Sequence, residues 1–192
     1  MSTQNKQWHC QVLGSAIKIA GKTMRPLITD SELLAVVNSI VSEEEMADWY
    51  PVSILIDLFD IAEKNYVVEI LAGAAAMGVL KDMLGKLGVD TPKKALMTLA
   101  TSYKHQHRGM AGEFKIDMLS ETKAAVIDST YAPCGYLGSL CKMSIAGFGA
   151  KNVEIDHIPE QCKNKNSKDC KLIMSWLEDE NLKLRRRTQK QQ

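Results

Sequence analysis

The stretch that decides the fold runs from residue 134 to residue 176 and reads CGYLGSLCKMSIAGFGAKNVEIDHIPEQCKNKNSKDCKLIMSW. Its first part, residues 136–149, is rich in small and apolar side chains and predicts a helix. Residues 152–158 and 170–176 then predict two strands, separated by a polar loop. The stretch therefore predicts one helix followed by a pair of strands.

The chain upstream of this stretch predicts a second pair of strands and, before it, several helices. Residues 113–119 alternate apolar and polar side chains, and residues 123–129 follow after a turn, which is typical of an antiparallel hairpin. Before residue 110 the apolar spacing is helical, beginning with residues 9–21. We therefore expect an α+β fold, with N-terminal helices followed by a four-stranded antiparallel sheet in the order strand-strand-helix-strand-strand.

Length and charge limit the classes of protein that the chain can represent. Its 192 residues are enough for one domain, which we expect over residues 1–178, followed by a charged, flexible tail over residues 179–192. The residues before position 183 hold 19 Lys and Arg against 23 Asp and Glu, a net charge of −4, which makes nucleic acid an unexpected partner. No apolar run is long enough for a membrane span, and the polar start predicts a cytoplasmic protein.

Five cysteines in such a chain favour reduced thiols or metal ligands over disulfides. Cys162 and Cys170 flank a polar loop, and a hairpin can bring two such thiolates to one Zn²⁺ at about 2.3 Å. Cys134, at the start of the predicted helix, is our preferred third ligand. Three residues remain open as the fourth ligand: His157, Glu154 and Glu160.

The alternative interpretation of these cysteines is structural. A free cysteine often acts as a small buried apolar residue. We assign that role to Cys10 and Cys141. Cys141 lies two helical turns from Cys134, so the two thiols share a helix face but cannot bind the same ion.

The quoted stretch resembles the 4-vinyl reductase-type domain over about residues 110–177. The features that carry the resemblance are Cys134 before a G-x-x-G helix, a strand at residues 153–157, and the pair Cys162 and Cys170 eight positions apart. That family shares its fold with haem nitric-oxide/oxygen-binding domains and with transport-particle subunits of vesicle tethering. The resemblance implies a structural zinc, bound by the three cysteines, next to an apolar ligand pocket.

This chain departs from the family at the fourth ligand. The family places a glutamate just before the first of the paired cysteines, whereas Pro159-Glu160-Gln161 fills that region here. In the haem-binding relatives a histidine near the end of the last helix before the sheet binds iron, which makes His105 and His107 candidate haem ligands. Those relatives also carry a Y-x-S-x-R motif, and residues 131–135 lack its serine and arginine.

Aromatic side chains near the expected contact between helices and sheet are candidates for the pocket lining, although each also suits ordinary core packing. They are Tyr103, Tyr131, Tyr136, Phe148 and Trp176.

These observations favour a non-enzymatic small-molecule-binding or sensory module of the vinyl-reductase-like fold, since no paired carboxylates or nucleophile–base arrangement stands out. We expect a structural Zn²⁺, a small hydrophobic or aromatic ligand, a homodimer and a separate signalling partner. Two other classes remain open. One is a haem-binding gas sensor or tetrapyrrole-related reductase, and the other is a structural or tethering protein of the transport-particle fold.

Overall fold

The computed structural model describes residues 9–42, 49–163 and 167–179, with only the backbone of residues 78–86. Its helices are α1 (Gly14–Met24), α2 (Ser31–Ser42), α3 (Ser53–Lys64), α4 (Val68–Lys86), α5 (Pro92–Gln106) and α6 (Cys134–Ala146). Its strands are β1 (Cys10–Leu13), β2 (Trp49–Pro51), β3 (His107–Gly109), β4 (Phe114–Ser120), β5 (Lys123–Asp128), β6 (Ala150–His157) and β7 (Cys170–Glu178). The expected tail from residue 180 onward lies outside the described residues.

The larger sheet has four strands in the order β4-β5-β7-β6, and every neighbouring pair is antiparallel. The chain forms β4 and β5, then α6, then β6 and β7, so the predicted α+β fold and element order are confirmed. The last strand, β7, lies between β5 and β6. As a result, the β6–β7 hairpin pairs with the β4–β5 hairpin through β7 and β5.

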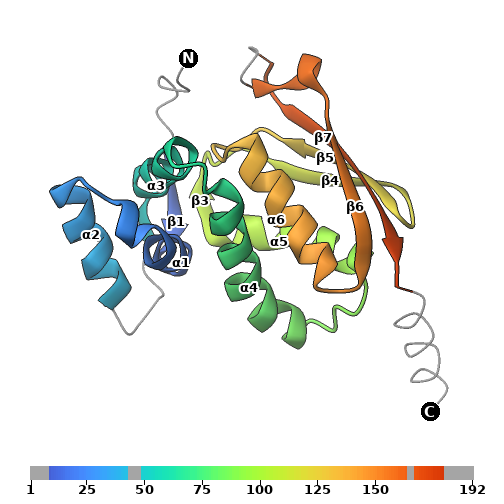
Figure 1. Cartoon of the computed structure of the whole chain (residues 1–192), viewed down its shortest axis with the longest axis horizontal. Coiled ribbons are helices and arrows are strands. Elements are labelled where there is room, and N and C mark those ends of the chain that lie inside the picture. Colours follow the sequence, from blue (N-terminus) through green and yellow to red (C-terminus); the bar gives the residue numbers. More distant parts are fainter. Residues whose placement is uncertain (1–8, 43–48, 164–166, 180–192) are drawn as a thin grey trace.

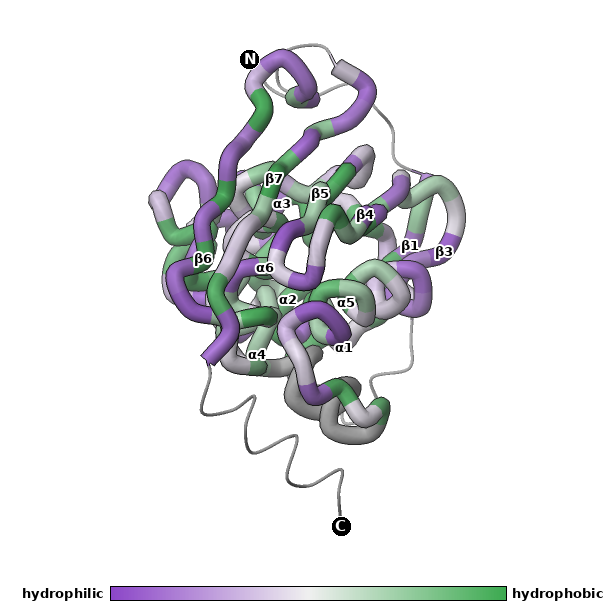
Figure 2. Tube along the Cα trace, turned by 90° about the vertical axis from the view of Figure 1, so that its right-hand side faces the viewer, coloured by the Kyte–Doolittle hydropathy of each residue, from purple (hydrophilic) through white to green (hydrophobic). Residues whose placement is uncertain are grey.

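The helices cover one face of this sheet (Figure 1). Helix α6 lies on the sheet, with α5 beside it and α4 packed against its far side. The strands alternate accordingly: Cys170, Leu172, Met174 and Trp176 of β7 are buried, while the residues between them are half-buried. Figure 2 shows the same alternation of hydrophilic and hydrophobic positions along β6.

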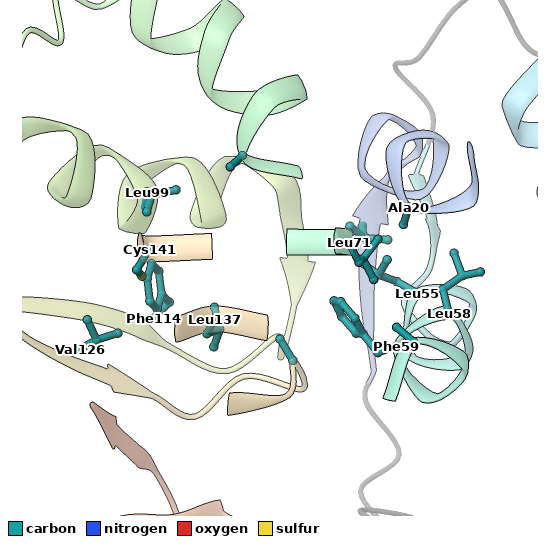
Figure 3. Packing of buried hydrophobic residues seen from close by; sticks show 14 of the residues in the cluster. Ala20, Leu55, Leu58, Phe59, Leu71, Leu99, Phe114, Val126, Leu137 and Cys141 are labelled. Atoms are coloured by element: carbon teal, nitrogen blue, oxygen red, sulfur yellow. The ribbon is translucent and has the colours of Figure 1, made fainter. Parts of the chain in front are cut away.

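The core extends from the sheet to the N-terminal helices (Figure 3). One part lies between the sheet, α5 and α6, and a second lies where α1, α3 and α4 meet. Labelled members of the first part are Leu99, Phe114, Val126, Leu137 and Cys141, and those of the second are Ala20, Leu55, Leu58, Phe59 and Leu71. No helix among the described residues is long and apolar enough to cross a membrane.

A second sheet, β2-β1-β3, differs from the sequence prediction. The predicted helix over residues 9–21 is wrong at its start, because Cys10–Leu13 is a strand and α1 begins at Gly14. Val12 pairs with Tyr50 on one side and with His107 on the other. Such short strands depend on partners far away in the sequence, so local apolar spacing cannot reveal them.

Candidate metal centre and adjoining pocket

Four potential metal ligands meet at one end of the sheet. Cys134 is the first residue of α6, His157 is the last of β6, Cys162 follows the next turn, and Cys170 is the first of β7. Their ligand atoms all lie within 4.8 Å of one another. Four residues from four positions in the chain therefore converge on one point.

Strand register explains this convergence. Cys170 pairs with Asp128, the last residue of β5, and His157 pairs with Leu172. The end of β5, the end of β6 and the start of β7 therefore lie next to one another (Figure 1). Because α6 begins soon after β5 ends, the side chain of Cys134 also reaches this end of the sheet.

One of the distances already matches a tetrahedral ion, and the other is that of a hydrogen bond, which a metal would replace at about 3.5 Å. The Sγ atoms of Cys134 and Cys162 are 3.9 Å apart, and Nε2 of His157 is 3.0 Å from Sγ of Cys170. Zn–S bonds of about 2.3 Å in tetrahedral geometry place two sulfurs roughly 3.8 Å apart. Cys162 and Cys170 are buried, Cys134 is half-buried and His157 is exposed, so the imidazole closes the site on its solvent side.

The protein favours the thiolate form at one of these cysteines. The pKa of Cys134 is lowered, first because the Cys170 thiol donates a hydrogen bond to it and also because the Lys163 ammonium lies nearby; burial opposes this. The same shared proton raises the pKa of Cys170. Metal binds thiolates, so the cluster already holds one ligand in the required form.

The four residues are the three cysteines predicted from the sequence and one of the three candidates for the fourth ligand. Glu154 and Glu160 are exposed and are not part of the group. Cys10 and Cys141 are buried in the core cluster, in agreement with the packing role expected for them. That the four residues bind a metal stays a prediction.

Sequence reasoning missed one residue next to the cluster. The Lys163 ammonium is paired with the carboxylate of Asp128, whose side chain is 1% exposed, and also donates to backbone carbonyls. A lysine in a polar loop normally indicates a solvent-exposed side chain. The one sequence signal was Asp128, at the end of the predicted strand over residues 123–129, because a carboxylate at such a position needs a cation if it is buried.

A cavity of about 80 Å³ lies among the helices and reaches β4. Tyr103, Tyr131 and Tyr136, which we predicted as pocket residues, line it together with His107. The other lining residues are mainly apolar: Ala16, Leu55, Phe59, Ala75, Leu99, Ser102, Gln106, Phe114, Ala132, Leu137 and Leu140. Phe148 and Trp176 lie elsewhere in the core, and His105 is exposed on α5.

The imidazole of His107 is fixed at the edge of this cavity. Its Nδ1 is 2.7 Å from the carbonyl oxygen of Tyr103, so Nδ1 carries the proton and donates. Nε2 therefore accepts from the Tyr131 hydroxyl at 2.6 Å. The ring also stacks on Tyr103, with ring centroids 3.9 Å apart, and burial lowers its pKa.

Solved structures to which this chain is similar include H-NOX proteins, the haem nitric-oxide/oxygen-binding class. One from S. oneidensis, in the Fe(II)NO ligation state, has a TM-score of 0.63 and 15% identity, covering 85% of this chain and 98% of that chain. An H-NOX protein from K. algicida in the Fe(II) unliganded state has a TM-score of 0.59 and 14% identity, and the match covers 87% of this chain and 97% of that chain. A mutant H-NOX protein from T. tengcongensis has a TM-score of 0.61 and 11% identity, and the match covers 85% of this chain and 96% of that chain.

At these identities the likeness shows the fold alone. The sequence resemblance implied a fold that is shared with haem nitric-oxide/oxygen-binding domains, and the likeness confirms this fold. It does not show that the chain belongs to the 4-vinyl reductase-type family. No protein-family profile and no curated protein matches the chain.

Proposed function

We propose that the chain is a small-molecule-binding sensor module with a structural Zn²⁺ at Cys134, His157, Cys162 and Cys170. The observation that carries the proposal is the convergence of these four ligand atoms within 4.8 Å, at the start of the helix that also lines the cavity. Three thiolates and one imidazole form a closed tetrahedral set typical of structural zinc. A bound zinc would fix the β6–β7 hairpin to α6.

The second element of the proposal is a ligand in the cavity. Leu137 and Leu140 line the cavity from α6, and Cys134 begins the same helix, so both sites depend on its position. A ligand that prefers one placement of α6 would shift the population of that placement. The signal would pass to a dimer partner or to a separate protein.

Haem is a second candidate ligand, favoured by the solved neighbours, which are described in iron ligation states. His107 is the one imidazole among the described residues that line the cavity. Its Nε2, however, is engaged by Tyr131, and none of those lining residues is Arg or Lys that could pair with haem carboxylates. The cavity also falls far below the roughly 300–1,000 Å³ of drug-sized ligand sites.

The cavity as it stands therefore does not fit haem and favours a smaller, mainly apolar molecule. An engineered apolar cavity of about 150 Å³ binds benzene or xenon, so a cavity of about 80 Å³ suits an apolar molecule no larger than these. The absorption spectrum of protein purified from haem-supplemented cells separates the two candidates. We expect no stoichiometric Soret band; one equivalent of haem that is lost in His107→Ala would establish the haem-binding sensor instead.

Benzene and xenon serve as probes of the apolar cavity. We expect xenon, the smaller probe, to shift the amide NMR signals of Leu99, Tyr103 and Leu137, which line the cavity, and benzene to shift them less. Ala75→Met, which fills the cavity from α4, should abolish these shifts, whereas Ala146→Met at the exposed end of α6 should keep them. Equal shifts in both variants would contradict ligand binding at this cavity.

A further inference from the structure

Lys163 uses its ammonium group entirely inside the protein. It is paired with Oδ2 of Asp128 and donates to the carbonyl oxygens of Thr130 at 2.6 Å and Ala132 at 3.0 Å. An ammonium group has three protons to donate, and these three acceptors match them. The Lys163 side chain is only 15% exposed.

The acceptors belong to a braced segment between β5 and α6. Oδ1 of Asp128 accepts from the backbone N–H of Thr130 at 2.8 Å, and Oγ1 of Thr130 accepts from the N–H of Ala132 at 3.2 Å. Side-chain hydrogen bonds therefore link residue 128 to residue 130, and residue 130 to residue 132. Lys163 binds this segment at three points, which fixes its distance from the turn that carries Lys163 itself.

The contact of Lys163 joins the two chain segments that carry Cys134 and Cys162, two of the proposed metal ligands. Each of these segments is called an arm below. Lys163 directly follows Cys162, and Ala132 lies two residues before Cys134. Within the described residues, the lysine thus links the arm of Cys162 to the arm of Cys134, whose sulfurs are 3.9 Å apart.

The energetics argue that the link serves position rather than overall stability. Burying an ion pair costs desolvation that its attraction often fails to exceed, so such a pair is weak support for a purely stabilising role. Zinc with three thiolates and a neutral imidazole also carries a net charge of −1, which a nearby ammonium compensates. Groups just outside the ligands commonly orient them in this way.

We propose that Lys163, through Asp128, is a positioning residue that holds Cys134 and Cys162 at ligand spacing before the metal arrives. The inference rests on the proposed metal centre and adds that the centre is preformed. Metal then binds without first ordering these two arms. Lys163 would set the affinity for zinc without touching the ion.

The test is zinc affinity, measured by competition with a chromophoric chelator on the full chain. Lys163→Met keeps the aliphatic stem and removes the ammonium, and we expect zinc to bind about 10–100-fold more weakly. Lys168→Met, which removes an exposed lysine of the same loop, should change the affinity less than about twofold. A variant that bound zinc as tightly as the wild type would overturn the positioning role.

Lys163→Met leaves the buried Asp128 carboxylate without its cation, so folding needs its own control. The double variant Asp128→Asn/Lys163→Met removes both charges and should restore the stability of the metal-free protein while keeping the weakened zinc affinity. If stability and zinc affinity recovered together, the link would be merely structural and the inference wrong. If the wild type itself bound no zinc, the proposed metal centre would fail, and that result is distinct from unchanged affinity in the variants.

Discussion

At the scale of single residues, His107 is the group whose state the fold controls most clearly. Its ring lies between Tyr103 and Tyr131, its Nδ1 donates to a backbone carbonyl, and its Nε2 accepts from a phenol. Burial lowers its pKa, and the hydrogen bond to the Tyr103 carbonyl opposes this in part. The imidazole is therefore neutral in the folded protein at neutral pH.

This gives a prediction for pH. In the unfolded chain the pKa of His107 is about 6.5, above its folded value, so unfolding takes up a proton as the pH falls below that point. The folded protein should lose stability between pH 7 and pH 5, with His107 contributing at most about 1.4 kcal/mol per pH unit. Urea titrations should show a shallower pH dependence for His107→Gln.

The exposed His105 provides the matched control. His105→Gln should leave the pH dependence of the wild type unchanged. If the free energy of unfolding fell equally steeply with decreasing pH in the wild type and in His107→Gln, the buried imidazole would not be the cause of the acid sensitivity.

The choice of His157 over Glu154 follows from strand geometry, whereas Glu160 lies beyond β6, in the turn Pro159–Gln161. Successive side chains of a strand point to opposite faces, so Glu154, three residues before His157 on β6, points to the other face of the sheet. Spacing alone left all three open because it fixed neither the extent of β6 nor its face. Asn152, with a φ of 49° beside a break in the β6 register, shifts that pattern as well.

At the scale of elements, Gly112 controls the entry into β4. It has a φ of 79°, and a Cβ there would lie 2.5 Å from the carbonyl oxygen of Ser129 and 2.8 Å from Cα of Thr130. The segment 129–130 leads from β5 toward Cys134. A side chain at position 112 would therefore disturb the segment that leads to the candidate metal centre.

Gly112→Ala should consequently destabilise the protein more than Gly88→Ala. Gly88 also has a positive φ, 64°, but a Cβ there meets nothing within 4 Å among the described residues. Gly88→Ala should cost only the left-handed backbone penalty of about 1–2 kcal/mol, and Gly112→Ala should cost that plus the backbone clash. Chemical denaturation measures both; equal losses would contradict the close approach at Gly112.

Element prediction from the sequence succeeded where the signal is local. The helical apolar spacing before residue 110 is such a signal, and side-chain caps that the structure shows accompany it: Asp30 accepts from the N–H groups of Glu32 and Leu33 at the start of α2, and Thr91 accepts from the N–H of Lys94 at α5. The two hairpins of the larger sheet follow from alternation and turns. The three-stranded sheet escaped prediction because β1, with four residues, depends on partners near positions 50 and 108.

At the scale of the whole molecule, α6 connects the candidate metal centre to the cavity. Cys134 begins this helix, and Tyr136, Leu137 and Leu140 line the cavity from it. The sequence predicted the cysteine set and three tyrosines of the cavity from residue type and order. It could not predict the cavity size or the Lys163–Asp128 link, because both depend on how distant segments pack.

Metal removal should therefore lower the stability of the entire fold. A ligand that binds only the folded state adds about 2.7 kcal/mol when present at 100 times its Kd. We expect the midpoint of thermal unfolding to rise with free zinc in the wild type. Cys162→Ser should abolish this dependence, whereas Cys141→Ala, at a buried cysteine outside the cluster, should lower stability but keep it.

The central claim is that one zinc ion joins α6 to the β6–β7 hairpin through three sulfurs and one imidazole. X-ray absorption at the zinc edge, combined with metal analysis of protein purified from zinc-replete medium, tests it most directly. The account predicts about one zinc per chain with three sulfurs near 2.3 Å and one nitrogen near 2.0–2.1 Å. Less than about 0.2 equivalents of zinc, or a shell of nitrogen and oxygen alone, would contradict it.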